Sequence, residues 1–316
     1  MVSGTIGVAI VQDRPVPFAV SDGLAGMQML FADVAGGSLQ LAAFGEAFVG
    51  GYPLWLDHAP AAAQWGNAGT ASIHQLLLEH ALVAGDPRLV PLQQIVDTSG
   101  TLLSFGGHER IGRTLYNSQW LLRPSAPPLV HRKLVATHGE RLLWGQGDGA
   151  SLSLHQTPWG NIGMLMCWEH WMPLARAALH QQGEAVHVAA WPSVIDLHLL
   201  ASRHYGFEGR CFVLAAGAVQ HRDDLLAGLE RVGGDAAARA LIQSMPDRQL
   251  QMGGSAIIAP DTRLLAQAGA GCEIISATLD LSEIGRALAT FDAAGHYARP
   301  DIFTLSVDRR ARLAPG

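Results

Sequence analysis

The sequence predicts an α/β protein, because short apolar runs of strand length alternate with longer stretches whose apolar residues recur at helical spacing. Residues 161–192 contain the whole pattern in order: an apolar run, a polar turn, an amphipathic stretch and a second apolar run. The chain has 316 residues, of which 49% are hydrophobic, so it can bury a large core. It has no internal repeat and no linker-like stretch, and we expect a single domain over residues 1–316.

The first half of the chain predicts four strands and three helices. The strands are expected at residues 6–12, 39–44, 102–105 and 114–122, and the helices at residues 22–34, 64–83 and 89–97. The polar residues 106–113 are expected to link two of these strands, and the proline-rich residues 124–128 to break the chain after them.

The second half begins with a strand at residues 162–166 and a short polar turn. Pro173 suits the first turn of a helix, where its missing N–H costs nothing, and Gly183 suits the end of that helix. The later strands are expected at residues 184–191, 212–216, 253–259 and 272–277, with a surface helix and loop at 222–248 and a helix at 281–289.

Composition excludes several functional classes. The net charge is −6 without a basic stripe, so we expect no nucleic-acid partner. No run of ~18 uncharged apolar residues predicts a membrane span. The first residues do not resemble a signal peptide, and the three cysteines lie too far apart for a disulfide framework or a C-x-x-C metal motif. A cytoplasmic location is therefore expected.

Cys167 stands where the first central strand gives way to the polar turn before a helix. Backbone N–H groups and the positive end of a helix favour the thiolate at such a position, and the same groups could stabilise negative charge on a substrate. A small buried core residue is the alternative, since free cysteine is often buried. Choosing between these interpretations requires a base and a cation elsewhere in the chain.

Two other segments offer those groups. Glu46 follows a strand and precedes a loop rich in glycine and aromatic residues, which suggests a lined pocket, although a lone loop glutamate can also be a solvated charge. Lys133 lies in a basic triplet within an apolar context, and a solvated charge cluster is again the alternative. The glycine-rich residues 145–149 match neither a phosphate-binding loop nor a dinucleotide fingerprint.

Taken together, several segments resemble the nitrilases, the nitrile-cleaving branch of the carbon–nitrogen hydrolase superfamily. They are F-G-E-A-F-V-G-G-Y-P around Glu46, H-R-K-L-V-A-T-H-G-E-R around Lys133, G-M-L-M-C-W-E-H around Cys167, E-G-R-C-F-V-L around Cys211 and F-D-A-A-G-H-Y-A-R-P-D from residue 291. The resemblance implies an α-β-β-α sandwich that pairs into an αββα-αββα homodimer or a higher homo-oligomer. It also implies hydrolysis of a small-molecule nitrile to a carboxylic acid and ammonia, with no cofactor and no metal.

The resemblance also implies roles for individual residues. Glu46 is expected as the general base, Lys133 as the cation, Cys167 as the nucleophile and Glu140 as a second glutamate that orients the lysine or a water molecule. The reaction would pass through a thioimidate and then a thioester on the cysteine. The backbone N–H of Trp168 is a candidate donor to the charge that develops on the substrate.

Aromatic residues near these segments could line a substrate pocket or pack in the core. Tyr52, Trp168 and Trp191 are the candidates, and if they line the pocket, an aryl or arylaliphatic nitrile fits better than cyanide. His170 lies three residues after Cys167 and could also reach the site, although Cys–His enzymes usually take their histidine from elsewhere in the fold. The other histidines lack metal-ligand spacing.

One departure from the family pattern is Gly45, where proline is common, and it predicts a more flexible loop around Glu46. Two alternative functions stay open at this point. An amidase or carbamoylase could use the same three residues, although C-W-E-H resembles nitrilases more closely. A non-catalytic scaffold or binding protein would be expected to lack Glu46, Lys133 or Cys167, and the sequence has all of them.

Overall fold

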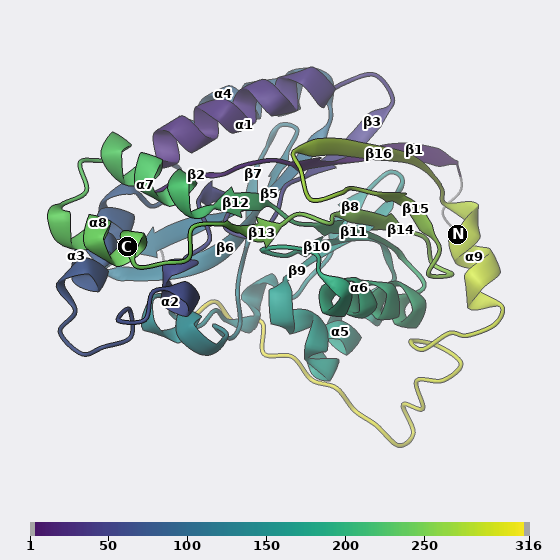
Figure 1. The fold of residues 1–316 in the computed structure, drawn as a ribbon. Coiled ribbons are helices and arrows are strands. Elements are labelled where there is room, and N and C mark those ends of the chain that lie inside the picture. The colour runs from purple at the N-terminus through teal and green to yellow at the C-terminus, as the bar shows by residue number, and fades with distance from the viewer. Residues whose placement is uncertain (1–3, 313–316) are drawn as a thin grey trace.

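Two β-sheets lie face to face in the computed structural model, which describes residues 4–312, and helices cover their outer faces (Figure 1). The eight-stranded first sheet has the order β16-β1-β3-β5-β4-β2, and β6 and β7 continue from β5. Its strands are β1 (Thr5–Gln12), β2 (Val16–Pro17), β3 (Leu39–Ala43), β4 (Val49–Gly50), β5 (Leu102–Ile111), β6 (Thr114–Arg123), β7 (Ala126–Arg132) and β16 (Glu273–Asp280).

The six-stranded second sheet has the order β15-β14-β11-β10-β9-β8. Its strands are β8 (His155–Thr157), β9 (Gly160–Met166), β10 (Glu184–Ala190), β11 (Phe212–Ala216), β14 (Ala256–Ile258) and β15 (Leu264–Gln267). The central strands β9, β10 and β11 are parallel, and β10 is buried along its whole length. A strand covered on both faces is rich in apolar residues, and the six apolar residues among 184–191 made this strand predictable although Glu184 and His187 lie in it.

Three apolar layers hold the sandwich together. Ile10 and Leu41 of the first sheet share one buried cluster with Val188 and Leu214 of the second sheet. Helices α1 (Val20–Val34) and α4 (Val90–Ser99) cover the outer face of the first sheet, and α5 (Pro173–His180) and α6 (Asp196–Gly209) cover that of the second (Figure 1). The structure confirms the predicted α/β class and the α-β-β-α sandwich that the resemblance implies.

Four more helices, α2, α3, α7 and α8, pack together at one end of the sandwich and share an apolar cluster (Figure 1). These elements are α2 (Trp55–His58), α3 (Ala68–His80), α7 (Arg222–Arg231) and α8 (Ala236–Gln243), with the small sheet β12 (Val219–His221) and β13 (Gln249–Met252) beside them and α9 (Ser282–Leu288) at the opposite end. Short 3₁₀ helices lie at Pro87–Leu89 (η1), His138–Leu142 (η2), Gly149–Ser151 (η3) and Cys167–Trp171 (η4). Among residues 4–312, no helix is long and apolar enough to cross a membrane.

The polar segment after residue 105 is not the expected linker. It continues β5 as far as Ile111 and pairs with β6. Glu109 is buried there because Arg132 and Ser118 both donate to its carboxylate. The prolines after residue 124 do not interrupt the strand pattern either, because they lie in β7, which pairs with β6 and, among residues 4–312, with no other strand, so missing donors are tolerated at this sheet edge.

Among the elements that were not predicted, α6 and β15 have identifiable reasons. Helix α6 buries mainly small or polar residues, including Ala201, Ser202 and Gly206, so it lacks an apolar stripe. Strand β15 is a short edge strand with little buried surface. The predicted surface segment at 222–248 forms two helices, because Gly233 and Gly234 separate α7 from α8.

Candidate active site

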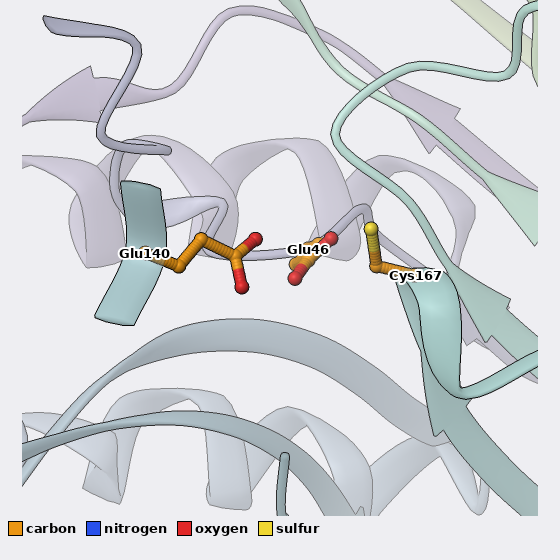
Figure 2. A group of neighbouring side chains, drawn as sticks. All are labelled: Glu46, Glu140 and Cys167. Atoms are coloured by element: carbon orange, nitrogen blue, oxygen red, sulfur yellow. The ribbon is translucent and has the colours of Figure 1, made fainter. Parts of the chain in front are cut away.

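Glu46, Lys133 and Cys167 each lie shortly after the end of a strand, and the fold brings them together at one end of the sandwich. Glu46 follows β3 of the first sheet, Lys133 follows β7, and Cys167 follows β9 of the second sheet. In Figure 2 the Glu46 carboxylate lies between Glu140 and the sulfur of Cys167. Residues distant in the sequence therefore share one buried site.

Close backbone contacts fix the segment that carries Glu46. Its N–H donates to the carbonyl of Trp191 at 3.1 Å, and Gly106 donates to the carbonyl of Gly45. A Cβ on Gly106 would lie 2.3 Å from the Ala47 nitrogen, and a Cβ on Gly45 would lie 3.0 Å from the Trp191 oxygen. The expectation of a flexible loop at Gly45 is therefore wrong, because its lack of a side chain permits tight packing against a neighbouring segment.

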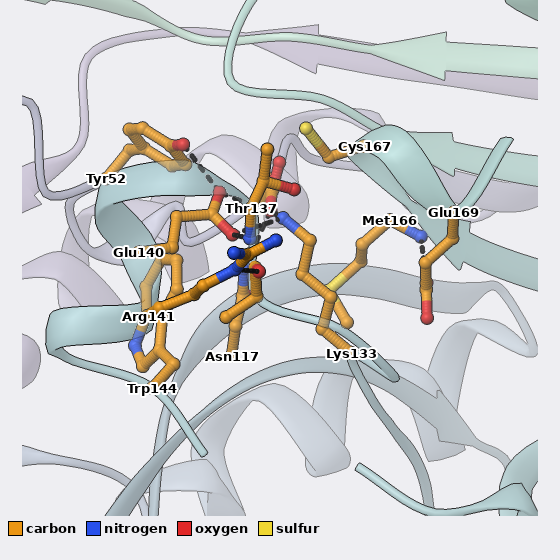
Figure 3. Close-up of polar contacts among 12 residues, drawn as sticks. Tyr52, Asn117, Lys133, Thr137, Glu140, Arg141, Trp144, Met166, Cys167 and Glu169 are labelled. Atoms are coloured by element: carbon orange, nitrogen blue, oxygen red, sulfur yellow. Dashed lines mark hydrogen bonds and ion pairs between the residues drawn. The ribbon is translucent and has the colours of Figure 1, made fainter. Parts of the chain in front are cut away.

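The Lys133 ammonium is held between two carboxylates, and Figure 3 shows it pointing toward one of them, that of Glu140. Its Nζ donates to Glu46 Oε1 at 2.7 Å and to both Glu140 oxygens at 2.9 and 2.7 Å. Glu140 lies on η2 and also accepts the Tyr52 hydroxyl at 2.6 Å and the Thr137 backbone N–H at 2.7 Å. All three charged side chains are buried, so the lysine has fixed partners on two sides.

The Cys167 thiol lies within 4.8 Å of carboxylate oxygens of both Glu46 and Glu140. Its residue has a φ of 50°, in the left-handed region that a side chain other than glycine rarely adopts. Such backbone conformations persist only where the surrounding contacts enforce them, and they concentrate at functional sites. This turn places the sulfur at the end of β9, facing Glu46 (Figure 2).

The electrostatics of the site determine the state of the Cys167 side chain. Burial raises the pKa of Cys167 and Glu46 raises it further, and together they outweigh the lowering effects of Lys133 and the Trp168 backbone N–H. The local N–H group favours the thiolate, as the position at a strand end suggests, but burial outweighs it, and the thiol form agrees with the expected transfer of its proton to Glu46. A base must therefore remove the proton when substrate is bound.

Glu46 has the properties of that base. Burial, opposed by Lys133 and reinforced by Glu140, raises the pKa of Glu46 to about 7. Among the described residues, its Oε2 has no hydrogen-bond partner, so this oxygen is free to take a proton. Burial disfavours charge on Lys133, but Cys167, Glu46 and Glu140 raise its pKa well above the usual value, which keeps it an ammonium.

Two residues of the site were missed by sequence reasoning. Asn117 of β6 donates to Glu46 Oε1 at 2.7 Å, and its backbone carbonyl accepts the N–H of Lys133. Glu169 accepts the backbone N–H of Leu134 at 2.8 Å and that of Met166 at 2.7 Å. Glu169 thus joins the lysine segment to the cysteine segment. The place of Glu169 in the C-W-E-H motif was the available signal, whereas Asn117 stands beside the polar residues Ser118 and Gln119 in the same strand and nothing distinguished it from them.

A cavity of about 390 Å³ opens at Cys167. Its other lining residues are Tyr52, Leu54, Asp57, His58, Thr137, His138, Trp168, Pro192, Ser193, Ile195, His198, Leu250, Gln251 and Met252. Tyr52 and Trp168 lie where the pocket interpretation places them.

Trp191 and His170 do not line this cavity. Trp191 is fully buried, its ring stacks on His170 and His198, and its indole N–H donates to Ser202. His170 is buried, its Nδ1 contacts the carbonyl oxygen of Cys167, and its Nε2 contacts His187. The expectation that these two side chains reach the substrate is wrong, because both turn into the layer between the second sheet and its helices.

Glu46, Glu140 and Cys167 also offer donor atoms of the kind that bind metal ions. The Lys133 ammonium, however, lies 2.7 Å from oxygens of both glutamates and fills the place that a cation would take. The glutamate oxygens are therefore suited to hold the lysine ammonium as their cation. A second group, His221, Asp223 and Asp247, is more exposed, and Arg222 pairs with both of its carboxylates.

Comparison with known proteins agrees with this geometry. The sequence profile described as carbon-nitrogen hydrolase matches residues 7–288. An aliphatic nitrilase of Sinorhizobium fredii is 36% identical over 97% of this chain and 96% of its own, and a bifunctional nitrilase/nitrile hydratase of Oryza sativa subsp. japonica is 34% identical over 98% and 86%. A carbon-nitrogen hydrolase from Helicobacter pylori G27 has a similar fold, with a TM-score of 0.71 at 13% identity over 95% of this chain and 97% of its own.

Proposed function

Because the chain belongs to the carbon–nitrogen hydrolase family, we propose that it is a nitrilase, which hydrolyses a small-molecule nitrile to a carboxylic acid and ammonia. Two relatives named as nitrilases match nearly its whole length, at 36% and 34% identity. The observation that carries the proposal is the Lys133 ammonium held between Glu46 and Glu140, beside a cysteine thiol.

The first step uses the raised pKa of Glu46. Glu46 takes the Cys167 proton as the sulfur attacks the nitrile carbon, so a C–S bond forms while one π bond of the nitrile breaks. The electron pair moves to nitrogen, where Lys133 and the Trp168 N–H stabilise the charge. Glu46 then returns its proton to nitrogen, which gives a neutral thioimidate on Cys167.

The second step consumes water. Glu46 removes a proton from a water molecule that attacks the thioimidate carbon and passes it to nitrogen, which gives a tetrahedral intermediate that carries a hydroxyl and an amino group. Glu46 then transfers the hydroxyl proton to the amino group, so that the C–N bond breaks, ammonia leaves and the carbonyl of the thioester forms. The thioester that remains is hydrolysed by a second water, which releases the acid and restores the thiol. If the tetrahedral intermediate expels the sulfur instead, the product is an amide, the outcome implied by the second half of the rice relative's name.

The cavity supports an aryl or arylaliphatic nitrile as the substrate. Trp168 is about half exposed at its edge, and Leu54, Ile195 and Met252 supply apolar surface around the thiol. A volume of about 390 Å³ is far larger than cyanide requires and is within the usual range for small-molecule sites. Tyr52 adds an aromatic edge beside Glu140.

We also propose that two copies pair through the outer helices of the second sheet. Leu174 of α5 and Leu197, Leu200 and Phe207 of α6 are all exposed apolar side chains. A second copy would bury this surface. Sedimentation or light scattering that gives a single monomer mass would contradict the pairing.

The test of the proposed reaction is ammonia release from a panel of nitriles and their matching amides. We expect ammonia from aryl and arylaliphatic nitriles and none from Cys167→Ala, whose circular dichroism should match the unmodified protein. Ammonia from amides alone would make the protein an amidase with the same catalytic residues. Turnover of neither panel would favour the non-catalytic alternative.

A further inference from the structure

His198 lines the cavity at Cys167, and the proposed reaction does not use it. It lies in the first turn of α6. Its ring stacks on that of Trp191, with the ring centroids 4.3 Å apart and an angle of 11° between the planes. Its Nδ1 contacts the backbone carbonyl oxygen of Ser193. The ring is therefore held on one face and at one nitrogen, so its orientation in the cavity wall is fixed.

The contact with Ser193 determines which ring nitrogen carries the hydrogen. A carbonyl oxygen can only accept, so His198 Nδ1 must be the donor. Burial lowers the pKa of His198 and outweighs the opposing effect of this hydrogen bond, so the ring is neutral under weakly alkaline conditions. A neutral ring with its hydrogen on Nδ1 has a lone pair on Nε2. His198 Nε2 is therefore a hydrogen-bond acceptor.

This acceptor has no partner within the protein. His198 Nε2 makes no hydrogen bond to any residue among 4–312. In the same part of the chain, the enclosed polar atoms without partners include both ring nitrogens of His180, but His198 Nε2 is not one of them. A group inside the cavity can therefore reach it. An apolar substrate that covered Nε2 would remove its water without replacing the hydrogen bond, which costs free energy.

The other polar groups of the cavity wall are less suited to recognise a neutral substituent. Tyr52 already donates its hydroxyl to a catalytic glutamate, and the amide atoms of Gln251 are enclosed. Asp57 and His138 lie 3.7 Å apart and are both well exposed. His58 makes no side-chain hydrogen bond to a described residue, so its ring is free to turn. His198 is therefore the accessible acceptor whose orientation is fixed.

Backbone contacts also fix the segment that holds His198. The Val194 N–H donates to the Gly253 carbonyl at 2.7 Å, and the Met252 N–H donates to Ser193 Oγ at 2.8 Å. Little order has to be imposed when a ligand binds to such a segment. Ser193 lines the cavity too, and its hydroxyl hydrogen has no acceptor among the described residues. The wall thus offers one acceptor and one donor, and a hydroxyl group is a small neutral substituent that can use both.

We propose that His198 is a specificity-determining residue whose Nε2 accepts a hydrogen bond from a hydroxyl group of the substrate. The inference rests on the proposed function, because it requires a nitrile bound at Cys167 to occupy this cavity. It narrows the substrate class from aryl and arylaliphatic nitriles in general to those that carry a hydroxyl substituent. No bond of the substrate forms or breaks at His198.

The test compares hydroxylated nitriles with their fluoro analogues at pH 7.5. The probes are the ortho, meta and para isomers of hydroxyphenylacetonitrile and fluorophenylacetonitrile. Fluorine is small and cannot donate, so the ratio of kcat/KM within each pair reports the hydrogen bond. We expect at least one hydroxylated isomer to be preferred by about three- to ten-fold, the range for one neutral hydrogen bond. A ratio near one for all isomers would overturn the proposal.

Variants assign the preference to a residue. His198→Phe keeps an aromatic ring for Trp191 but lacks the acceptor, so the ratio should fall to about one. His198→Leu also lacks the acceptor and should give the same ratio if the first variant does not fold. His58→Phe is the matched control, since it replaces another cavity histidine, and it should keep the ratio of the wild type. A ratio that survives in both His198 variants, or is lost in His58→Phe as well, would contradict the assignment.

Binding measurements separate this inference from the proposed function. Isothermal titration of the same pairs into Cys167→Ala needs no turnover, and the hydroxylated member should bind more tightly by a similar factor. The difference should vanish in Cys167→Ala/His198→Phe. Equal Kd values within every pair would refute the role of His198 even in a protein that hydrolyses nitriles. A preference that depends on His198 would support it even if the panel of nitriles gave no ammonia.

Discussion

Glu140→Gln should move the acidic limb of the pH–rate profile to lower pH. Glu46 must be ionised to accept the Cys167 proton, and its pKa is about 7, so wild-type kcat/KM should fall as the pH drops below about 7. Glu140 is one of the groups that raise this pKa, and its loss also leaves Lys133 paired with Glu46 alone. Both effects stabilise the ionised form of Glu46, so the sign of the shift is downward.

The geometry sets the scale of the shift. Carboxylate oxygens of Glu46 and Glu140 lie within 4.8 Å of each other. Two unit charges 4.8 Å apart interact by about 3.5 kcal/mol at an effective dielectric constant of about 20, which corresponds to roughly 2.5 pKa units when nothing in the site relaxes. Movement of Lys133 and entry of water will reduce this value, so we expect a shift of about one to two units.

The assay measures kcat/KM for nitrile hydrolysis between pH 5 and 9, with ammonia release as the readout. Maximal kcat should also fall, because Lys133 loses the partner that orients it, but the fractional loss should be smallest at low pH. Glu79→Gln, an exposed substitution of the same kind on α3, should leave the profile unchanged. A limb that stays in place or moves to higher pH would refute the assignment of Glu46 as the base.

Other perturbations test separate parts of the site. Asn117→Ala removes a hydrogen bond that lowers the pKa of Glu46, so the acidic limb should move to higher pH and kcat should fall about ten-fold; an unmoved limb in a pH–rate series would contradict this. Gly106→Ala places a Cβ 2.3 Å from the Ala47 nitrogen and should lower the free energy of unfolding by about 2–4 kcal/mol in urea titration, whereas an unchanged midpoint would show that the loop can move. Trp168→Ala should raise KM for aryl nitriles by about ten-fold and spare small aliphatic ones, and equal effects on both would remove Trp168 from the pocket.

Much of the site was predictable because its chemistry is carried by residues next to strand ends. Glu46, Lys133, Glu140 and Cys167 stand in short motifs, and the family resemblance indicated which of several acidic and basic residues to combine. Asn117 could not be found in this way. Its contribution is a hydrogen bond across the sheet edge, and such a contact exists only once β6 and the Glu46 loop are packed.

The direction in which a side chain points was harder to predict than its closeness to the site. Trp191 and His170 are close to Cys167 or Glu46 in sequence or space, yet both side chains turn into the core. Along a strand, the side chains of adjacent residues point to opposite faces, so one residue can face the pocket while its neighbour is buried in the core. The net effect on the pKa of Cys167 could not be read from its position at a strand end, because burial depends on the whole fold and outweighs the local N–H group.

In the fold as well, elements with a clear residue pattern were predictable, and elements that depend on contacts between distant residues were not. Mostly apolar buried strands such as β10 and amphipathic helices such as α1 followed from the residue pattern. The second half of β5 did not, because its buried Glu109 is satisfied by Arg132 from another strand. A polar segment is therefore predicted as a loop unless the residues that pair with its side chains are known.

The central claim is that Cys167 forms a covalent bond to the carbon of the substrate. Wild-type protein quenched with acid during turnover of an aryl nitrile, digested and analysed by mass spectrometry, should carry an acyl or imidoyl adduct on the peptide that contains Cys167 and none on Cys211 or Cys272. An adduct on either other cysteine, or undiminished ammonia release by Cys167→Ala, would contradict the account.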